Sequence, residues 1–334
     1  MAFAIWSYPN ETDFKVTRAP LRKYTLFEPK KLQHSFVVMP FDASNGLYAI
    51  PIDRSVHVTQ ARDFLSSELP KLFPTKVMPT LPSYEGQVAA AVAKIQRIPA
   101  FNKVVLSRYA QVDGVNFNEG WLDQLRTAYP TAFIAMVSSA KFGTWLTASP
   151  ELFLKRDESV FSSFSLAGTK FSANTVLGIK EQQEQSIVTD YIRDAFERSG
   201  LRSHVDGNRE QEAGTLVHLL NVVEGQIRMD APQVHQLVAN LHPTPAVGGE
   251  PLSIARASID QEGYDRGLYT GFMGEVEGSE HFELYVNLRC AQVFSNAIRF
   301  YAGAGITGDS IPHKEFLETE AKMNVLKSVL LSQQ

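Results

Sequence analysis

The sequence has almost no cysteine, since Cys290 is the single one among 334 residues. One thiol cannot form a disulfide within the chain, and it excludes a metal site built from several cysteines. We therefore expect a protein that folds without disulfides in a reducing compartment, with Cys290 as a buried strand residue.

Positive charge and long apolar runs are also scarce. The chain has 32 Lys and Arg residues against 36 Asp and Glu residues, a net charge of −4. Nucleic-acid-binding proteins usually carry a basic excess, so the balance argues against a nucleic-acid partner. No stretch approaches the roughly 18 consecutive apolar residues of a membrane span, and the first residues do not resemble a secretion signal. We expect a soluble, cytoplasmic protein that contacts neither membrane nor nucleic acid.

General catalytic motifs are missing as well. There is no P-loop, and the run GAGITG lacks the strand, glycine turn and helix order of a dinucleotide site. A serine nucleophile elbow and an HExxH metal motif are absent too. The eight histidines show no metal-ligand spacing, which makes most of them structural or surface residues.

The pattern of apolar residues predicts an α+β fold in which large antiparallel sheets are layered with helices. Residues 1–80 contain short strand-like runs between proline and glycine turns, so we expect a β-rich opening of the same domain as residues 81–334. The whole chain is then effectively one large domain. Helices are predicted at 84–96, 118–130, 180–199 and 312–331, and strands at 103–112, 131–140, 143–156, 281–294 and 298–307.

Two of the predicted helices place carboxylates on the edge that faces the core. In 180–199, Glu181 and Glu184 precede the apolar stripe that begins at Ile187, and in 312–331 Glu315 and Glu318 lie on the face of Val325. Inward-facing acids need a partner.

The predicted strands near the C-terminus carry polar or glycine positions of their own. In 281–294, apolar residues alternate with polar ones, which places Arg289 on the polar face. In the following strand, Gly303 and Gly305 allow another group to approach the backbone closely.

A series of short motifs occurs in one order along the chain. They are KVVLSR (103–108), SPELFL (149–154), LAGTK (166–170), KEQQEQSIVTDYI (180–192), LHPTPAVGGEP (241–251), DRGLYTGFMGEV (265–276), NLRCAQ (287–292), YAGAGIT (301–307) and EFLETEAKMN (315–324). Over residues 80–334 this set resembles the chorismate-binding enzyme family, which includes isochorismate synthases, salicylate synthases, aminodeoxychorismate synthase and anthranilate synthase component I. The resemblance implies the fold of anthranilate synthase component I.

The resemblance implies that Lys103 is the general base and Glu151 the general acid. Isochorismate formation needs such a pair, because water adds to ring carbon 2 while the hydroxyl on carbon 4 leaves. A lysine acts as a base only when part of it is neutral, and a buried glutamate must stay protonated to act as an acid.

The resemblance also implies a magnesium site and a site for the chorismate dianion. Glu184 and Glu318 match the family's Mg²⁺ ligands, with Glu181 and Glu315 as supports through water. The substrate-binding positions implied in this chain are Gly168, Thr169, His242, Ala246, Tyr269, Arg289, Gly303, Gly305 and Lys322. Among these, His242 would lie against the substrate ring, and Arg289 and Tyr269 would lie beside the enolpyruvyl group.

Two features bear on the branch of the family. Isochorismate synthases often have HEH around the first metal ligand, where this chain has Gln183, Glu184 and Gln185, a departure that concerns the surroundings of the metal. Ala246 stands where amino-transferring and salicylate-forming relatives usually have threonine, and no LLES or GTVSGAPK-like element is present. Water is then the expected nucleophile, so we expect the chain to be an isochorismate synthase, which is an isomerase. We also expect it to be a monomer that needs no glutaminase subunit.

Two alternatives stay open at this point. A salicylate synthase would share nearly all of these residues, including Tyr269, and would eliminate pyruvate from isochorismate in the same pocket. A non-catalytic chorismate-binding protein is disfavoured because the acid, base and metal positions are all occupied. Menaquinone, siderophore and salicylate pathways all consume isochorismate, and the sequence does not distinguish between them.

Overall fold

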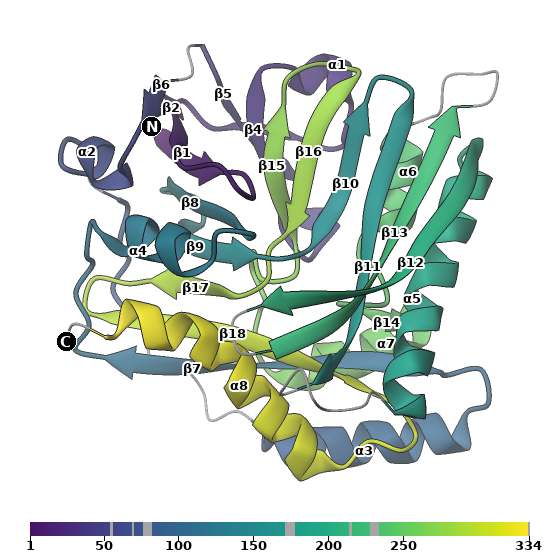
Figure 1. The fold of residues 1–334 in the computed structure, drawn as a ribbon. Coiled ribbons are helices and arrows are strands. Elements are labelled where there is room, and N and C mark those ends of the chain that lie inside the picture. Colours follow the sequence, from purple (N-terminus) through teal and green to yellow (C-terminus); the bar gives the residue numbers. More distant parts are fainter. Residues whose placement is uncertain are drawn as a thin grey trace.

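The computed structural model describes residues 1–53, 56–68, 70–75, 82–170, 178–213, 216–227 and 234–332. These residues form two nine-stranded sheets, in which every pairing between strands is antiparallel. Helices cover the outer faces of the sheets (Figure 1). The predicted α+β architecture of antiparallel sheets layered with helices is confirmed. Within the described residues, no helix is long and apolar enough to cross a membrane.

The first sheet, in spatial order, consists of β14 (Gly249–Glu250), β7 (Lys103–Asp113), β18 (Ala297–Ile306), β17 (Cys290–Val293), β9 (Gly143–Ser149), β8 (Phe133–Ser139), β1 (Ala2–Ser7), β2 (Phe14–Ala19) and β6 (Val56–Val58). The second consists of β12 (Leu201–Ala213), β13 (Leu216–Ile227), β11 (Val160–Lys170), β10 (Leu152–Asp157), β16 (His281–Val286), β15 (Phe272–Val276), β4 (Ser35–Met39), β5 (Leu47–Pro51) and β3 (Arg22–Tyr24). The N-terminal strands thus extend both sheets.

The helices are α1 (Pro29–Leu32), α2 (Ala61–Leu65), α3 (Tyr84–Arg97), α4 (Trp121–Ala128), α5 (Ile179–Arg198), α6 (Val234–Leu241), α7 (Leu252–Ile259) and α8 (Pro312–Leu330), with 3₁₀ turns η1 (Ala43–Asn45) and η2 (Asp260–Glu262). Helix α8 packs along β18 of the first sheet, and α5 packs on β11 and β12 of the second (Figure 1).

The core is layered because most strands are buried on both faces. In β1, Phe3 and Ile5 face the helices α4 and α8, whereas Ala4 and Trp6 face the space between the two sheets. Alternation of side chains along a strand produces this division. On the far side of the second sheet, α5 contributes a stripe of buried residues to a third cluster: Val188, Ile192, Ala195 and Phe196.

Two segments that were each predicted as a single strand are in fact two strands in different sheets. Residues 143–156 form β9 in the first sheet and β10 in the second, and residues 281–294 form β16 in the second and β17 in the first. The prediction failed because alternation identifies buried strand residues but does not identify the sheet to which they belong. Both crossings are close together, because β9 pairs with β17 and β10 with β16.

Candidate active site

The two crossings carry two of the predicted site residues. Glu151 lies between β9 and β10, and Arg289 lies between β16 and β17. Backbone hydrogen bonds join the crossings, from Ala148 N to Arg289 O at 3.0 Å and from Val286 N to Glu151 O at 3.0 Å. The place where the chain changes sheet therefore brings the acid Glu151 and the buried cation Arg289 close together.

Arg289 has a backbone φ of +45°, in the left-handed region that non-glycine residues seldom adopt. Its buried guanidinium donates from Nη2 to Nε2 of His218 at 2.8 Å. Arginine has no acceptor atom, so His218 Nε2 must offer a lone pair, and the imidazole is neutral. The Nε atom of Arg289 is buried and has no hydrogen-bond partner among the described residues. Burial lowers the pKa of Arg289 from its ordinary value.

Lys103 begins β7 and is almost completely buried, with 1% of its surface exposed. Its Nζ lies 3.4 Å from Oε2 of Glu184 on α5. Both side chains pass over Gly305 of β18, where an added Cβ would come within 2.7 Å of Glu184 Oε2 and 2.8 Å of Lys103 Cε. A side chain at position 305 would displace one of the two, which explains the glycine that the sequence indicated as a site of close approach.

Lys322 and Glu318 extend the site from α8. Lys322 Nζ is 2.6 Å from Glu318 Oε1 and donates to Gly303 O at 2.9 Å. A Cβ at Gly303 would lie 3.0 Å from the hydroxyl of Tyr269, whose ring stacks on Tyr301 with centroids 5.6 Å apart. Burial raises the pKa of Tyr269. The phenol therefore stays protonated and can donate a hydrogen bond.

Glu151 differs electrostatically from the other carboxylates of the site. Its surface is 2% exposed, and burial raises its pKa to about 8, although the charges of Lys103, Arg289 and Lys322 lower it in part. A carboxyl group that is neutral at physiological pH can donate a proton, which an ordinary surface glutamate cannot do.

These side chains line one cavity. Its described lining consists of Lys103, Val105, Pro150, Glu151, Leu166, Ala167, Glu184, His218, Ala246, Val247, Tyr269, Leu288, Arg289, Tyr301, Ala302, Gly303, Gly305, Glu318 and Lys322. With Glu151 protonated, the lining has three cations against two carboxylates, a net charge of +1. An excess of positive charge in a buried cavity favours an anionic ligand.

Most of the predicted site residues whose side chains the structure describes lie in this lining, from Lys103 to Lys322, but His242 and Glu315 do not. His242 Nε2 faces the carbonyl oxygens of Pro40 and Phe41 at 3.0 and 3.2 Å, so this nitrogen carries the proton. Burial lowers the pKa of His242 to about 4, although the hydrogen bonds to Pro40 O and Phe41 O raise it in part. Its ring packs edge-on against Phe153 and Phe272. Since His242 lies outside the described lining of the cavity, its contact with a substrate ring stays a prediction.

Three further predicted residues are described only in part. Glu181 lies in α5, and Gly168 and Thr169 lie in β11, where the register shifts between Ala167 and Thr169. Their side chains lie outside the described part of the structure, so their predicted roles stay predictions. Glu315 on α8 is buried, with 2% of its surface exposed.

Sequence reasoning missed His218 and Tyr301. His218 lies in β13 and reaches the cavity through its contact with Arg289. Nothing local in the run LVHLL singles it out, because a histidine in an apolar strand is usually structural. Tyr301 belongs to the motif YAGAGIT, in which only Gly303 and Gly305 were predicted as site residues.

The donor set suits a hard divalent cation. Glu184 and Glu318 come from two helices and line the same cavity, and carboxylate oxygens are the ligands that Mg²⁺ prefers. Among the described residues, no three His, Cys, Asp or Glu side chains form a cluster that could hold a metal by themselves. Two carboxylates with water and an anionic substrate as further ligands remain compatible with Mg²⁺, which usually keeps several waters.

Comparison with known proteins gives a consistent result. Residues 55–331 match the family model described as chorismate binding enzyme. The chain is 31% identical over 313 residues to isochorismate synthase EntC of Escherichia coli K12, covering 87% of this chain and 79% of that one. It is 30% identical over 274 residues to isochorismate synthase DhbC of Bacillus subtilis, covering 75% of this chain and 68% of that one.

Solved structures share the fold at lower identity. The menaquinone-specific isochorismate synthase MenF of Escherichia coli superposes with a TM-score of 0.79 at 21% identity, covering 99% of this chain and 89% of that one. Anthranilate synthase component I of Streptococcus pneumoniae gives 0.70 at 16% identity, with coverages of 97% and 89%. Given the family match over most of its length, this chain belongs to the chorismate-binding enzymes.

Proposed function

We propose that this protein is an isochorismate synthase, an isomerase that converts chorismate reversibly to isochorismate. The observation that carries the proposal is the presence of Glu151, with its pKa raised to about 8, in the same buried cavity as Lys103. An acid that is protonated near neutral pH and a lysine in one water-restricted site are what the reaction needs. The similarity to EntC and DhbC supports the same activity.

Each of the two residues has one proton to move. Neutral Lys103 removes a proton from water as the water oxygen bonds to ring carbon 2. The ring double bond shifts, and the bond between carbon 4 and its hydroxyl breaks. Glu151 gives its proton to the departing oxygen, which leaves as water. The sum is an isomerisation, after which Lys103 returns its proton and Glu151 regains one through solvent.

The cations of the cavity account for binding of a dianion. Arg289 has a buried Nε without a hydrogen-bond partner among the described residues, so it can still donate to a carboxylate. Its Nη2 is oriented by His218. The protonated hydroxyl of Tyr269 lies beside Gly303 in the same cavity lining, where it can also donate to an anion. Ala246 lines the cavity, and it supports water as the nucleophile because amino-transferring and salicylate-forming relatives usually have threonine at this position.

We further propose that the activity depends on Mg²⁺, held by Glu184 and Glu318. When bound, the ion would supply positive charge to a carboxylate of the substrate. Each of these carboxylates lies beside a lysine, Lys103 at 3.4 Å from Glu184 and Lys322 at 2.6 Å from Glu318. A bound cation would compensate the charge of Glu184 while Lys103 is neutral and acts as the base. We expect Glu181 and Glu315 to support the site through water. We also propose that the protein acts as a single chain without a glutaminase subunit.

The test is to incubate purified protein with chorismate, first with Mg²⁺ and then with EDTA, in the absence of ammonia and glutamine. Products are identified by chromatography and proton NMR. A reversible mixture of chorismate and isochorismate that requires Mg²⁺ is expected. Salicylate with pyruvate would assign the protein to the salicylate synthases, and no conversion would refute an isomerase.

A further inference from the structure

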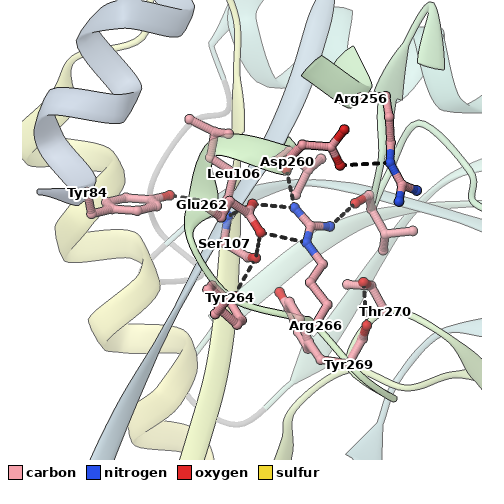
Figure 2. Close-up of polar contacts among 12 residues, drawn as sticks. Tyr84, Leu106, Ser107, Arg256, Asp260, Glu262, Tyr264, Arg266, Tyr269 and Thr270 are labelled. Atoms are coloured by element: carbon pink, nitrogen blue, oxygen red, sulfur yellow. Dashed lines mark hydrogen bonds and ion pairs between the residues drawn. The ribbon is translucent and has the colours of Figure 1, made fainter. Parts of the chain in front are cut away.

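Behind the cavity wall lies a buried ion pair that the reaction does not use, between Glu262 and Arg266 (Figure 2). Glu262 ends η2 and Arg266 follows four residues later, and both side chains are 1% exposed. Arg266 donates from Nε to Glu262 Oε2 at 2.9 Å and from Nη2 to Oε1. Removing two charges from water is costly, and the cost is recovered only where the remaining donors and acceptors are also used.

The pair directs its remaining hydrogen bonds at the backbone of the cavity wall. Arg266 donates to Val247 O at 2.9 Å and to Val105 O at 2.7 Å. Glu262 accepts from Ser107 N at 2.7 Å and from Ser107 Oγ at 2.8 Å (Figure 2). Val105 and Val247 both line the cavity.

These contacts take the place of a missing edge strand. β14 pairs with β7 only at Gly249 and Glu250, and Val105 N then donates to Gly248 O. Beyond that point the neighbouring chain leaves β7. The next polar groups on this edge, Val105 O and Ser107 N, would bind a backbone neighbour in a continued ladder. Here the side chains of Arg266 and Glu262 bind them instead.

Three parts of the wall therefore share one anchor. Strand β7 carries Lys103 two residues before Val105, and the turn of Val247 carries Ala246. The third part is Tyr269, whose backbone N donates to Arg266 O at 2.9 Å. A shift of the Arg266 side chain would move the strand of Lys103 relative to the turn of Ala246.

We propose that Glu262 and Arg266 are positioning residues, which set the distance between the strand of the general base and the turn that faces it. The proposal rests on the proposed function, because it assigns these residues to the same cavity. If the pair only stabilises the fold, a substitution in it changes only the amount of folded protein. If the pair positions the cavity wall, the substitution also changes KM and kcat of the molecules that fold.

The test compares Arg266→Lys with the matched control Arg126→Lys. Arg126 of α4 is also buried and donates to two backbone carbonyls, Tyr8 O at 2.9 Å and Tyr129 O at 2.7 Å, but it lies outside the cavity lining. In either variant, one ammonium cannot reproduce the planar fork of the guanidinium. Both variants should lose thermal stability.

Only Arg266→Lys should change catalysis by the folded protein. We expect its KM for chorismate to rise at least about fivefold and its kcat, corrected for the folded fraction by circular dichroism, to fall about tenfold. KM does not depend on how much protein is folded, so an unfolded fraction cannot produce the rise. For Arg126→Lys both constants should stay within about twofold of the wild type. A KM for Arg266→Lys within that range, or an equal change in the control, would overturn the proposal.

A milder variant keeps the test decisive if Arg266→Lys does not fold. Ser107→Ala removes only the hydroxyl that binds Glu262 Oε2 and lies 2.6 Å from Tyr264 OH. It should raise KM at least about twofold, and an unchanged KM would contradict a positioning role.

The products that the wild-type protein forms from chorismate distinguish a failure of the positioning role from a failure of the proposed function. If the wild type forms salicylate and pyruvate, the isochorismate synthase assignment fails, and the variants are compared on that reaction instead. If the wild type does not turn over chorismate, calorimetry with chorismate takes the place of kinetics. The positioning role then requires at least about fivefold weaker binding by Arg266→Lys, with the Arg126→Lys control unchanged.

Discussion

Two buried glutamates on the two sides of the cavity wall have opposite surroundings. Glu262 is 1% exposed, and both of its carboxylate oxygens accept hydrogen bonds from Arg266 and Ser107. Glu151 is 2% exposed, but no described side chain donates to its carboxyl group, and burial raises its pKa to about 8. Burial alone therefore does not define the role of a carboxyl group. A saturated set of donors places Glu262 in a structural ion pair, whereas the absence of such donors leaves Glu151 as a group that exchanges a proton near neutral pH.

The same contrast separates two histidines. His242 donates to backbone carbonyls outside the cavity, and His218 offers a lone pair to the cavity residue Arg289. In both comparisons, the group behind the wall is held by hydrogen bonds to residues outside the cavity lining, whereas Glu151 and His218 belong to that lining. Substitutions on the two sides of the wall should therefore have different effects.

The largest effect is expected on turnover. Lys103→Ala and Glu151→Gln each remove a proton-transfer group, so kcat should fall by about a thousandfold or more. The measurement is the initial rate of isochorismate formation, with circular dichroism to establish folding. The exposed pair of Glu85 and His313 offers a control, since Glu85→Gln should keep the wild-type rate. A variant at Lys103 or Glu151 with more than a tenth of wild-type activity would remove that residue from the mechanism.

The next effect concerns stability, where the two glutamates should respond with opposite sign. The folded-state pKa of Glu151 is raised from 4.5 to about 8, so its contribution to stability is fully present below pH 4.5 and is lost as the pH rises towards 8. Gln at this position avoids that loss. Glu151→Gln should therefore be more stable than the wild type by about 3 kcal/mol at pH 7, and equally stable at pH 4.

Glu262→Gln supplies the other half of this comparison. It leaves Arg266 buried without its charged partner, and should lower the free energy of unfolding by about 3–5 kcal/mol. Urea unfolding of both variants at pH 4, 5.5 and 7 measures the two effects. Destabilisation by Glu151→Gln at pH 7 would show instead that the Glu151 carboxylate is ionised and bound in the folded protein.

A smaller effect is expected at the carboxylates assigned to Mg²⁺. Glu318→Gln should raise the Mg²⁺ concentration for half-maximal activity by about tenfold, because one charged oxygen ligand is lost. Glu320→Gln on the same helix is the matched control, as Glu320 pairs with Arg108 and does not line the cavity. Identical magnesium titrations for the two variants would exclude Glu318 as a ligand.

Much of this arrangement could be predicted from the sequence, because it depends on local patterns. The helices α5 and α8 were predicted to within about one residue, and their inward carboxylates follow from 3.6-residue periodicity. The sheet crossings could not be predicted, because the apolar pattern of 281–294 continues through the residues where the chain changes sheet. Arg289 at φ +45° marks that change, and only the tertiary structure imposes it. The Glu262–Arg266 pair was missed because its partners, Val105 and Val247, are distant in the chain.

The smallest effect separates the two histidines and tests the contact with the substrate ring that the motif LHPTP suggested for His242. A typical hydrogen bond contributes about 1 kcal/mol, so His218→Ala should raise KM for chorismate by about fivefold as Arg289 loses its orientation. His242→Ala should leave KM within about twofold, although it removes the contacts with Pro40 O and Phe41 O and should lower thermal stability. The reverse result would place His242 against the substrate after all. That contact would use another part of the imidazole ring, because in this structure the proton of His242 Nε2 points at the carbonyls of Pro40 and Phe41.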